Sequence, residues 1–476
     1  MNKYTNPKIC SLPTAQELHA QLAATDNSTA REQIAKLFDA NTFVETSTFA
    51  KRGISDFIAT ERTSELEGVI TGYGAIGGRL VFAFVEDAER MGGAIDERHA
   101  KKIVDLYRLA LTNGAPVIGV FNSKGIDVFQ GTAGLAAYGK IIATVSKASG
   151  VIPQIALVAG KCIGTSATVA AMFDVVVKID FAELYVTSPA LTGKADAQAA
   201  IVHHTADEDG AIGFTKALLS FLPDNASSTI EAAPSSDNLN RLLGDLDFGG
   251  EGLAVISTIS DNGVFFELSH GYAPEAVTAF ATIGGVKCGI VANSFAVNEG
   301  RLSAAAARKI ARFVSLCDSF SIPVVTLVDS LGLAIDKNGE EAFAAELARL
   351  AVAYASSTCP KVTVILGHAI GASFILLGSK ALGADVTYSL DSAEIGALPA
   401  ESGVAFAWDK YITEEKTRES LVSEWLETVS SPVVAASSGE IDDIISVNEM
   451  RARICSALLM LCAKSDYRAN HKVLPL

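Results

Sequence analysis

The sequence predicts an α/β protein made of two copies of one unit, each with a parallel sheet covered by helices. The loop GKCIGTSA at 160–167 returns as GHAIGASF at 367–374, at a spacing of 207 residues. Upstream positions keep that spacing, because Pro116 matches Pro323 in the same way. A period of this length indicates a duplicated domain and not an array of small repeats.

Both copies have the same order of elements. In the first copy, the strand-like LVFAFV at 80–85 precedes a helix that starts near Glu97. In the second copy, CGIVANS at 288–294 precedes a helix that starts near Ala304. Proline-initiated apolar strands and amphipathic helices follow in each. Near-continuous apolar strands that alternate with helices are typical of parallel sheets covered on both faces.

A polar segment separates the two copies. The stretch PDNASSTIEAAPSSDN at 223–238 is rich in Pro, Ser, Asn and Asp, which is typical of a linker. We therefore expect an N-terminal domain at 1–235 and a C-terminal domain at 236–476.

Composition excludes several classes of function. The chain is 49% hydrophobic and carries a formal net charge of −16, which argues against binding to nucleic acid, since that affinity depends on clustered Lys and Arg. The seven cysteines form no CxxC pair, so we expect neither a metal site nor a dithiol redox site. The opening MNKYTNPKIC has no apolar signal segment, and a cytoplasmic protein with reduced thiols is expected.

The repeated loop has a chemical consequence of its own. A strand that ends in Gly-x-x-x-Gly and opens a helix leaves backbone N–H groups without intrahelical acceptors. Such amides bind anions, and they form an oxyanion hole when the anion is transient. The alternative is that these glycines only permit close packing of strand and helix.

Longer segments resemble a known family. They are STAREQIAKLFDANTFVETSTFAKRG at 28–53, EGVITGYGAIGGRLVFAFVEDAERMGGAIDERHAKKI at 67–103, GVKCGIVANSFAVNEGRLSAAAARKIARFVSLCDSFSIPVVTLVD at 285–329, and the closing HKVLPL. Over almost its whole length, the chain resembles the carboxyltransferase subunits of biotin-dependent acyl-CoA carboxylases and decarboxylases. Propionyl-CoA carboxylase beta and methylmalonyl-CoA decarboxylase alpha subunits represent this family.

The resemblance implies two crotonase (ClpP/crotonase)-like domains, each with one oxyanion hole. Gly164 and Thr165 would hold the carbonyl of a small acyl-CoA thioester as it becomes an enolate. Gly371 and Ala372 would hold the ureido oxygen of biotin. Further residues expected to bind the cofactor and substrate are Gly160, Gly125, His368, Ser373 and Phe374.

The resemblance also implies partners. The chain has no Met-Lys-Met stretch for biotin attachment, so biotin would arrive on a biotin carboxyl carrier protein. Biotin carboxylase or membrane decarboxylase subunits would complete the system. The family builds each site from the N domain of one subunit and the C domain of another, so we expect a hexamer arranged as a trimer of dimers.

Departures from the family pattern leave two alternatives open. Thr165 stands where glycine is usual, and Lys124 replaces a glycine of the CoA loop. These changes are compatible with a non-catalytic structural paralogue that assembles with an active carboxyltransferase subunit. A biotin-independent crotonase-type acyl-CoA enzyme is the other alternative. His99, Lys101 and Lys102 are expected on a solvated helix face, with contact to CoA phosphates as the alternative.

Overall fold

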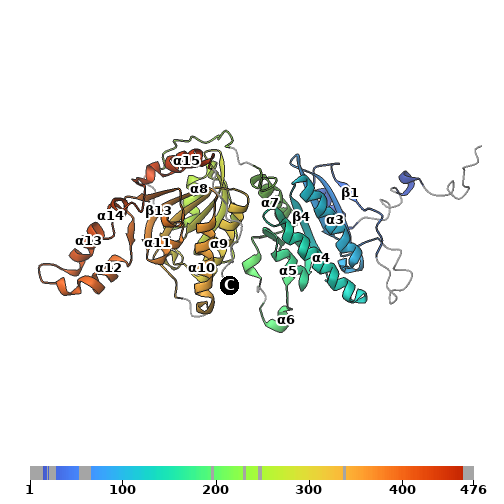
Figure 1. The fold of residues 1–476 in the computed structure, drawn as a ribbon, viewed down its shortest axis with the longest axis horizontal. Coiled ribbons are helices and arrows are strands. Elements are labelled where there is room, and N and C mark those ends of the chain that lie inside the picture. Colours follow the sequence, from blue (N-terminus) through green and yellow to red (C-terminus); the bar gives the residue numbers. More distant parts are fainter. Residues whose placement is uncertain are drawn as a thin grey trace, which may run out of the picture.

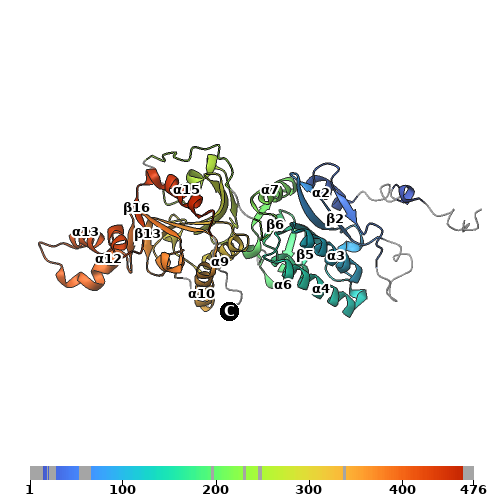
Figure 2. The ribbon, with the colours of Figure 1, turned by 45° about the horizontal axis from the view of Figure 1, so that its top comes forward.

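The computed structural model describes residues 14–18, 20, 28–52, 66–194, 198–228, 232–244, 249–335 and 339–464. The two halves of the chain lie side by side, each around its own sheet (Figure 1). The turned view shows the same separation, with the N-terminal half at one end and the C-terminal half at the other (Figure 2). Each sheet has eight strands.

The N-terminal half contains α2 (Thr29–Leu37), β1 (Val44–Thr46), β2 (Val69–Ile76), β3 (Arg79–Glu86), η3 (Met91–Gly93), α3 (Glu97–Asn113), β4 (Val117–Ser123), η4 (Val128–Gln130), α4 (Thr132–Ala148), β5 (Gln154–Ile163), α5 (Thr165–Ala171), β6 (Val175–Ile179), β7 (Glu183–Tyr185), α6 (Pro189–Thr192), η5 (Ala199–Ile201), β8 (His204–Ala206) and α7 (Glu208–Phe221). Its sheet order is β1-β2-β3-β4-β5-β6-β8, and β7 pairs with β5.

The C-terminal half contains α8 (Gly252–Ile259), η6 (Asp261–Gly263), β9 (Phe265–Leu268), β10 (Ala276–Ile283), β11 (Val286–Asn293), η7 (Asn298–Gly300), α9 (Ala304–Ser319), β12 (Val324–Ser330), α10 (Glu340–Ser356), β13 (Lys361–Ile370), α11 (Ala372–Leu376), η8 (Lys380–Leu382), β14 (Val386–Leu390), β15 (Glu394–Gly396), α12 (Ala400–Gly403), η9 (Val404–Trp408), η10 (Asp409–Tyr411), α13 (Arg418–Thr428), α14 (Pro432–Ser437), β16 (Asp443–Ile445), η11 (Val447–Glu449) and α15 (Met450–Leu461). Its sheet order is β16-β14-β13-β12-β11-β10-β9, and β15 pairs with β13.

The predicted duplication is confirmed at the level of the strands. Strands β2, β3, β4 and β5 begin and end 207 residues before β10, β11, β12 and β13. Helices α3 and α9 begin at Glu97 and Ala304, as predicted. The halves diverge after β15, where α12 and α13 project from the body of the C-terminal half (Figure 1). Helix α14 returns to the body and packs beside β15 and β16.

The predicted parallel sheets are confirmed, and each sheet also contains antiparallel pairs at one side. Pairs β3–β4, β4–β5 and β5–β6 are parallel, whereas β2 and β3 form an antiparallel hairpin. Gly77 and Gly78 make the hairpin turn with φ of 57° and 77°, a left-handed conformation that glycine adopts at little cost. Gly284 and Gly285 repeat this turn, with φ of 60° and 82°.

One hydrophobic cluster runs through both halves. It joins N-terminal core residues such as Phe121 and Phe173 to C-terminal residues such as Phe280 and Phe313. Arg312 on α9 also crosses the junction, because its guanidinium donates to the carbonyl of Phe173 at 2.7 Å. Within the described ranges, no helix is both long and apolar enough to span a bilayer.

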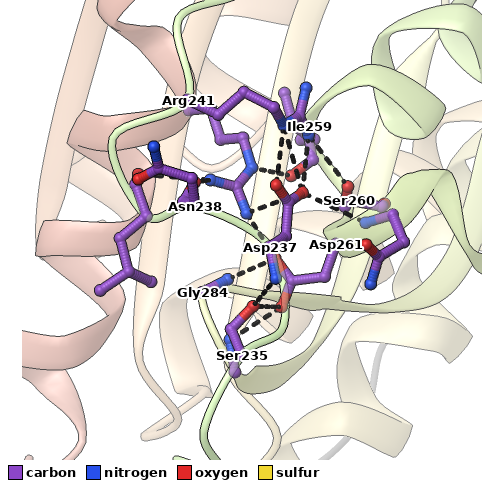
Figure 3. A network of polar contacts seen from close by, with 12 residues as sticks. Ser235, Asp237, Asn238, Arg241, Ile259, Ser260, Asp261 and Gly284 are labelled. Atoms are coloured by element: carbon purple, nitrogen blue, oxygen red, sulfur yellow. Dashed lines mark hydrogen bonds and ion pairs between the residues drawn. The ribbon is translucent and has the colours of Figure 1, made fainter.

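A polar network attaches the segment after residue 232 to the C-terminal half (Figure 3). Asp237 binds Arg241 through two nitrogens, and it lies 3.3 Å from Arg451 on α15. Asp261 accepts hydrogen bonds from the Ser235 hydroxyl and from Arg451. These contacts join Ser235 and Arg241 to the C-terminal half. The domain boundary at residue 235 stays a prediction.

Replacement of Arg451 by Met should strongly destabilise the C-terminal half. Arg451 is fully buried, so its loss leaves Asp261 without its charged partner in a poorly hydrated place. We expect a loss of about 3–5 kcal/mol in the free energy of unfolding, measured by urea denaturation. The matched control is Arg453→Met on the same helix, because its ion pair with Asp443 is exposed and worth less than about 1 kcal/mol. Equal losses in the two variants would contradict the role given to Arg451.

Candidate active site

The repeated loops leave their sheets beside a second loop in each half. Strands β4 and β5 are parallel, and Ser123 pairs with Cys162 close to their carboxyl ends. In the C-terminal half, Ser330 pairs with Ala369 in the same way. The segments that follow the paired strands therefore emerge at one edge of each sheet.

Gly164 and Gly371 start the two helices in almost the same conformation. Their φ and ψ angles are 60° and −124° for Gly164, and 59° and −130° for Gly371. Only glycine adopts this region without strain, which explains why both copies keep it. A Cβ added to Gly164 would meet no atom within 4 Å, so the space beside this turn is open.

The amides of these two glycines are already occupied. The Gly164 N–H donates to the carbonyl of Tyr185 in β7 at 2.9 Å, and the Gly371 N–H donates to the carbonyl of Gly396 in β15 at 2.8 Å. The expectation that these two N–H groups face a ligand is therefore wrong. The glycines shape the turn, while backbone carbonyl groups of β7 and β15 accept their N–H groups.

Thr165 and Ala372 provide the amides that remain. Each is the first residue of its helix, where the N–H has no intrahelical acceptor. Within the part of the chain that the structure describes, neither N–H has another acceptor. The side chain of Thr165 is exposed.

A second unpaired amide in each half was missed by the sequence analysis. Ile95 donates its N–H to Gly125 and accepts one from Asp127, so the intervening Ile126 directs its own N–H away from Ile95. No described group accepts that N–H. Ile126 and Thr165 lie three residues beyond the paired Ser123 and Cys162, at the same edge of the sheet.

The C-terminal half repeats this arrangement. Leu302 bonds to Gly332 and Ala334, which leaves the N–H of Leu333 without an acceptor among the described residues. Leu333 and Ala372 are therefore the counterparts of Ile126 and Thr165. The sequence signal for this second amide was the repeated Ser-x-Gly that begins at the last residue of β4 and of β12.

Gly125 and Gly332 position these second amides. Their φ angles are 100° and 103°, and the Gly125 N–H donates to the hydroxyl of Ser123 at 3.0 Å. The corresponding distance from Gly332 N to the hydroxyl of Ser330 is 3.3 Å. The hydroxyl thus closes a small turn in each loop, and glycine permits its backbone conformation.

Gly160 makes room for a neighbouring side chain. A Cβ at this position would lie 2.1 Å from Oδ1 of Asn122, an atom that accepts the N–H of Lys161 at 3.1 Å. Gly367 stands in the same relation to Asp329, with a Cβ contact of 2.6 Å. The structure thus gives Gly160 a packing role, whereas the sequence analysis expected it to bind the cofactor.

His368 carries a titratable group beside the second loop. Its Nδ1 lies 2.9 Å from Oδ1 of Asp329, and its ring stacks on Phe295 with centroids 4.7 Å apart. The hydrogen bond to Asp329 raises the pKa of His368. Lys161 occupies the equivalent position in the N-terminal half and is half exposed. Each loop therefore has a side chain able to carry positive charge at the same place.

Ser373 and Phe374 face the protein interior more than the loop opening. The Ser373 hydroxyl is buried and donates to the carbonyls of Ile370 and Ser330, at 2.8 and 3.2 Å. Phe374 is partly buried and packs against the hydrophobic core. The Ser373 hydroxyl thus links the start of α11 to β12. It does not point into the open space beside the loop.

A buried group of charged residues lies behind the first loop. Oε2 of Glu86 accepts the N–H of Asn122 at 2.8 Å. His99 is fully buried, with its ring nitrogens 3.6 Å from Glu67 and 3.9 Å from Glu86. Burial raises the pKa of Glu86 to about 7.

The prediction of a solvated helix face is wrong for two of its three residues. His99 is 0% exposed and Lys102 is 6% exposed, and Lys102 donates to the carbonyl of Val69 at 2.5 Å. Only Lys101 is exposed, in an ion pair with Asp105. In the described ranges, no group of three or more His, Cys, Asp or Glu is arranged to hold a metal ion.

Replacement of Glu86 by Gln should stabilise the protein above neutral pH. The pKa of Glu86 is about 7 in the folded state and ordinarily 4.5, so the protonated carboxyl favours the folded state. This contribution to the free energy of unfolding is lost as pH rises through 7. Each pKa unit corresponds to about 1.4 kcal/mol, so the stability of Glu86→Gln relative to wild type should improve by about 3 kcal/mol between pH 4.5 and 8. Urea denaturation at several pH values measures this difference.

The control is Glu97→Gln, which removes an exposed carboxylate whose pKa is lowered by its hydrogen bond to Lys140. The stability of Glu97→Gln relative to wild type should not rise between pH 4.5 and 8. A stability difference that is the same at pH 4.5 and pH 8 for Glu86→Gln would contradict the titration assigned to this residue.

Comparisons with known proteins agree with this architecture. Residues 23–474 match the family model of the carboxyl transferase domain. The chain is 35% identical to methylmalonyl-CoA decarboxylase subunit alpha of Veillonella parvula, covering 96% of this chain and 94% of that protein. It is also 35% identical to the methylmalonyl-CoA carboxyltransferase 12S subunit of Propionibacterium freudenreichii subsp. shermanii, covering 93% and 90%.

A solved structure shows the same fold. The crystal structure of transcarboxylase 12S, a hexamer assembly with hydrolysed methylmalonyl-coenzyme A bound, superposes with a TM-score of 0.91 at 31% identity. The match covers 98% of this chain and all of that chain. The duplicated fold, the paired loops and these similarities together show that this chain belongs to the carboxyl transferase family.

Proposed function

We propose that the chain is a carboxyltransferase subunit that moves a carboxyl group between biotin, carried by a partner protein, and a small acyl-CoA. The observation that carries this proposal is a pair of matched loop edges. The first consists of residues 122–127 and 160–165, and the second of residues 329–334 and 367–372. Each has two backbone amides for which no described residue supplies an acceptor. In this reaction class, the thioester oxygen of the acyl-CoA and the ureido oxygen of biotin each accept hydrogen bonds from such amides. The chain supplies one pair of amides in each half. The relatives at 35% identity are named for acyl-CoA decarboxylation and carboxyl transfer.

The first pair of amides suits the thioester. The N–H groups of Ile126 and Thr165 would donate to the thioester oxygen, which gains negative charge when the adjacent carbon becomes an enolate. Donors that are fixed before the reaction stabilise such charge without reorganisation. The half-exposed Lys161 lies close to this loop, with its Nζ 3.7 Å from Oε1 of Glu183.

The second pair suits biotin. The N–H groups of Leu333 and Ala372 would donate to the ureido oxygen, and His368 would add positive charge beside it. Biotin, when bound, supplies the carboxyl group or receives it. The amides of this chain orient the ureido ring, and they favour the form in which its oxygen is negative.

The proposal includes an assembly. The similarity to the 12S hexamer supports a hexamer, arranged as a trimer of dimers, in which the first loop edge of one subunit faces the second loop edge of another. Biotin would arrive on a biotin carboxyl carrier protein, and the system would include either biotin carboxylase or membrane decarboxylase subunits. We place the subunit in the cytoplasm, where free thiols such as the buried Cys162 and Cys288 stay reduced.

Proline substitutions test the two amides directly. Thr165 and Ala372 are first residues of helices, where proline fits the backbone and its missing N–H breaks no intrahelical bond. We expect Thr165→Pro and Ala372→Pro each to lower kcat by about 10²–10³ in biotin-dependent decarboxylation of methylmalonyl-CoA or malonyl-CoA. The matched controls Thr165→Ala and Ala372→Ser keep the amide, and they should retain activity within a few fold.

The outcomes separate the alternatives. Full activity in both proline variants would show that these amides do not act on the reacting oxygens. A wild-type protein that neither decarboxylates these thioesters nor binds them in calorimetry would overturn the enzyme assignment, and the chain would then have a structural role beside an active subunit.

A further inference from the structure

The first loop edge is held by buried charged groups at both ends. At the start of the loop, Glu86 accepts the N–H of Asn122 at 2.8 Å. At its end, Asp127 forms an ion pair with Arg52 at 2.7 Å. The side chains of Glu86, Asp127 and Arg52 are only 2–3% exposed. Ile126, which supplies an unpaired amide, lies between these two attachments.

The second loop edge has no equivalent charges. Asn293 occupies the position of Glu86, and its amide group donates to the carbonyl of Gly300 at 3.1 Å. Ala306 and Ala334 occupy the positions of His99 and Asp127. Two loops with nearly the same backbone are therefore held in different ways, and only the first depends on a buried carboxylate.

We propose that Glu86 is a positioning residue for the first loop edge, because its buried carboxylate fixes the N–H of Asn122 and with it the direction of the Ile126 amide. This inference rests on the proposed function for its catalytic consequence. Its structural part, the ordering of residues 122–127, is independent of any reaction.

The surroundings of Glu86 make this attachment sensitive to pH. His99 approaches from α3, with Glu67 on the other side of its ring. Tyr138 on α4 and Cys162 on β5 also interact electrostatically with Glu86. Burial raises the pKa of Glu86 to about 7, so its negative charge develops across neutral pH. In an opening that breaks the bond to the Asn122 N–H but leaves Glu86 buried, the carboxylate loses a stabilising partner, because a charged acceptor binds an N–H more strongly than a neutral one. For this local opening, the loop should therefore be better ordered at pH 8 than at pH 6.

Asp174 provides a matched control. Burial raises its pKa to about 7, and it accepts one backbone N–H, that of Gln154, at 2.8 Å. Gln154 begins β5, so this contact lies at the opposite edge of the sheet from the loop. Asp174→Asn removes a similarly titrating buried carboxylate without touching residues 122–127.

Hydrogen–deuterium exchange tests the ordering in the full-length protein. After correction for intrinsic rates, we expect protection of peptides covering 122–127 to rise several-fold from pH 6 to pH 8 in wild type and in Asp174→Asn. Glu86→Gln should lose this rise, and Glu86→Ala should lower protection at both pH values. Peptides covering 329–334 should be unchanged in every variant. Loop exchange in Glu86→Gln that matches wild type at both pH values would overturn the proposal.

Turnover tests the catalytic consequence separately. In wild type, kcat for biotin-dependent decarboxylation of methylmalonyl-CoA should rise through pH 7, and Glu86→Gln should flatten that rise and lower kcat about tenfold at pH 8, with little change in KM. Asp174→Asn should keep the wild-type profile. A wild-type profile in Glu86→Gln would overturn the positioning role, whereas absence of turnover in wild type would count against the proposed function and leave the exchange result to decide the role of Glu86.

Discussion

The candidate site depends on the parallel pairing of two neighbouring strands in each half. Because β4 and β5 run in the same direction, the loops that follow them emerge at one edge, although they are far apart in sequence. The left-handed Gly164 then turns the chain into α5. Since Tyr185 in β7 accepts the Gly164 N–H, the next amide, that of Thr165, has no acceptor among the described residues. Without this pairing, Ile126 and Thr165 would have no reason to lie together.

Duplication preserved the backbone and changed the chemistry around it. Asn122 and Lys161 of the first loop edge correspond to Asp329 and His368 of the second. The side chain of Asn122 or Asp329 accepts the following strand's N–H in both copies, so the geometry survives while the charge differs. The constraint on backbone direction is therefore stricter than the constraint on side-chain identity.

The sequence predicted what depends on local pattern and repetition. Strand positions followed from apolar runs in register, and the helix starts at Glu97 and Ala304 followed from the same comparison. The acceptor of the Gly164 amide could not be predicted, because Tyr185 is distant in sequence. The burial of His99 depends on how α3 packs against the sheet, since the exposed face of a helix in a charged segment is decided by tertiary contacts.

The continuous core that joins the halves has a thermodynamic consequence. Because Phe173 and Phe313 belong to one cluster and Arg312 crosses the junction, neither half can lose its packing without exposing part of the other. The chain should therefore behave as one cooperative unit, although each half is built around its own sheet. A ligand that binds one half then raises the unfolding free energy of both halves. Binding at either loop edge therefore stabilises the whole subunit.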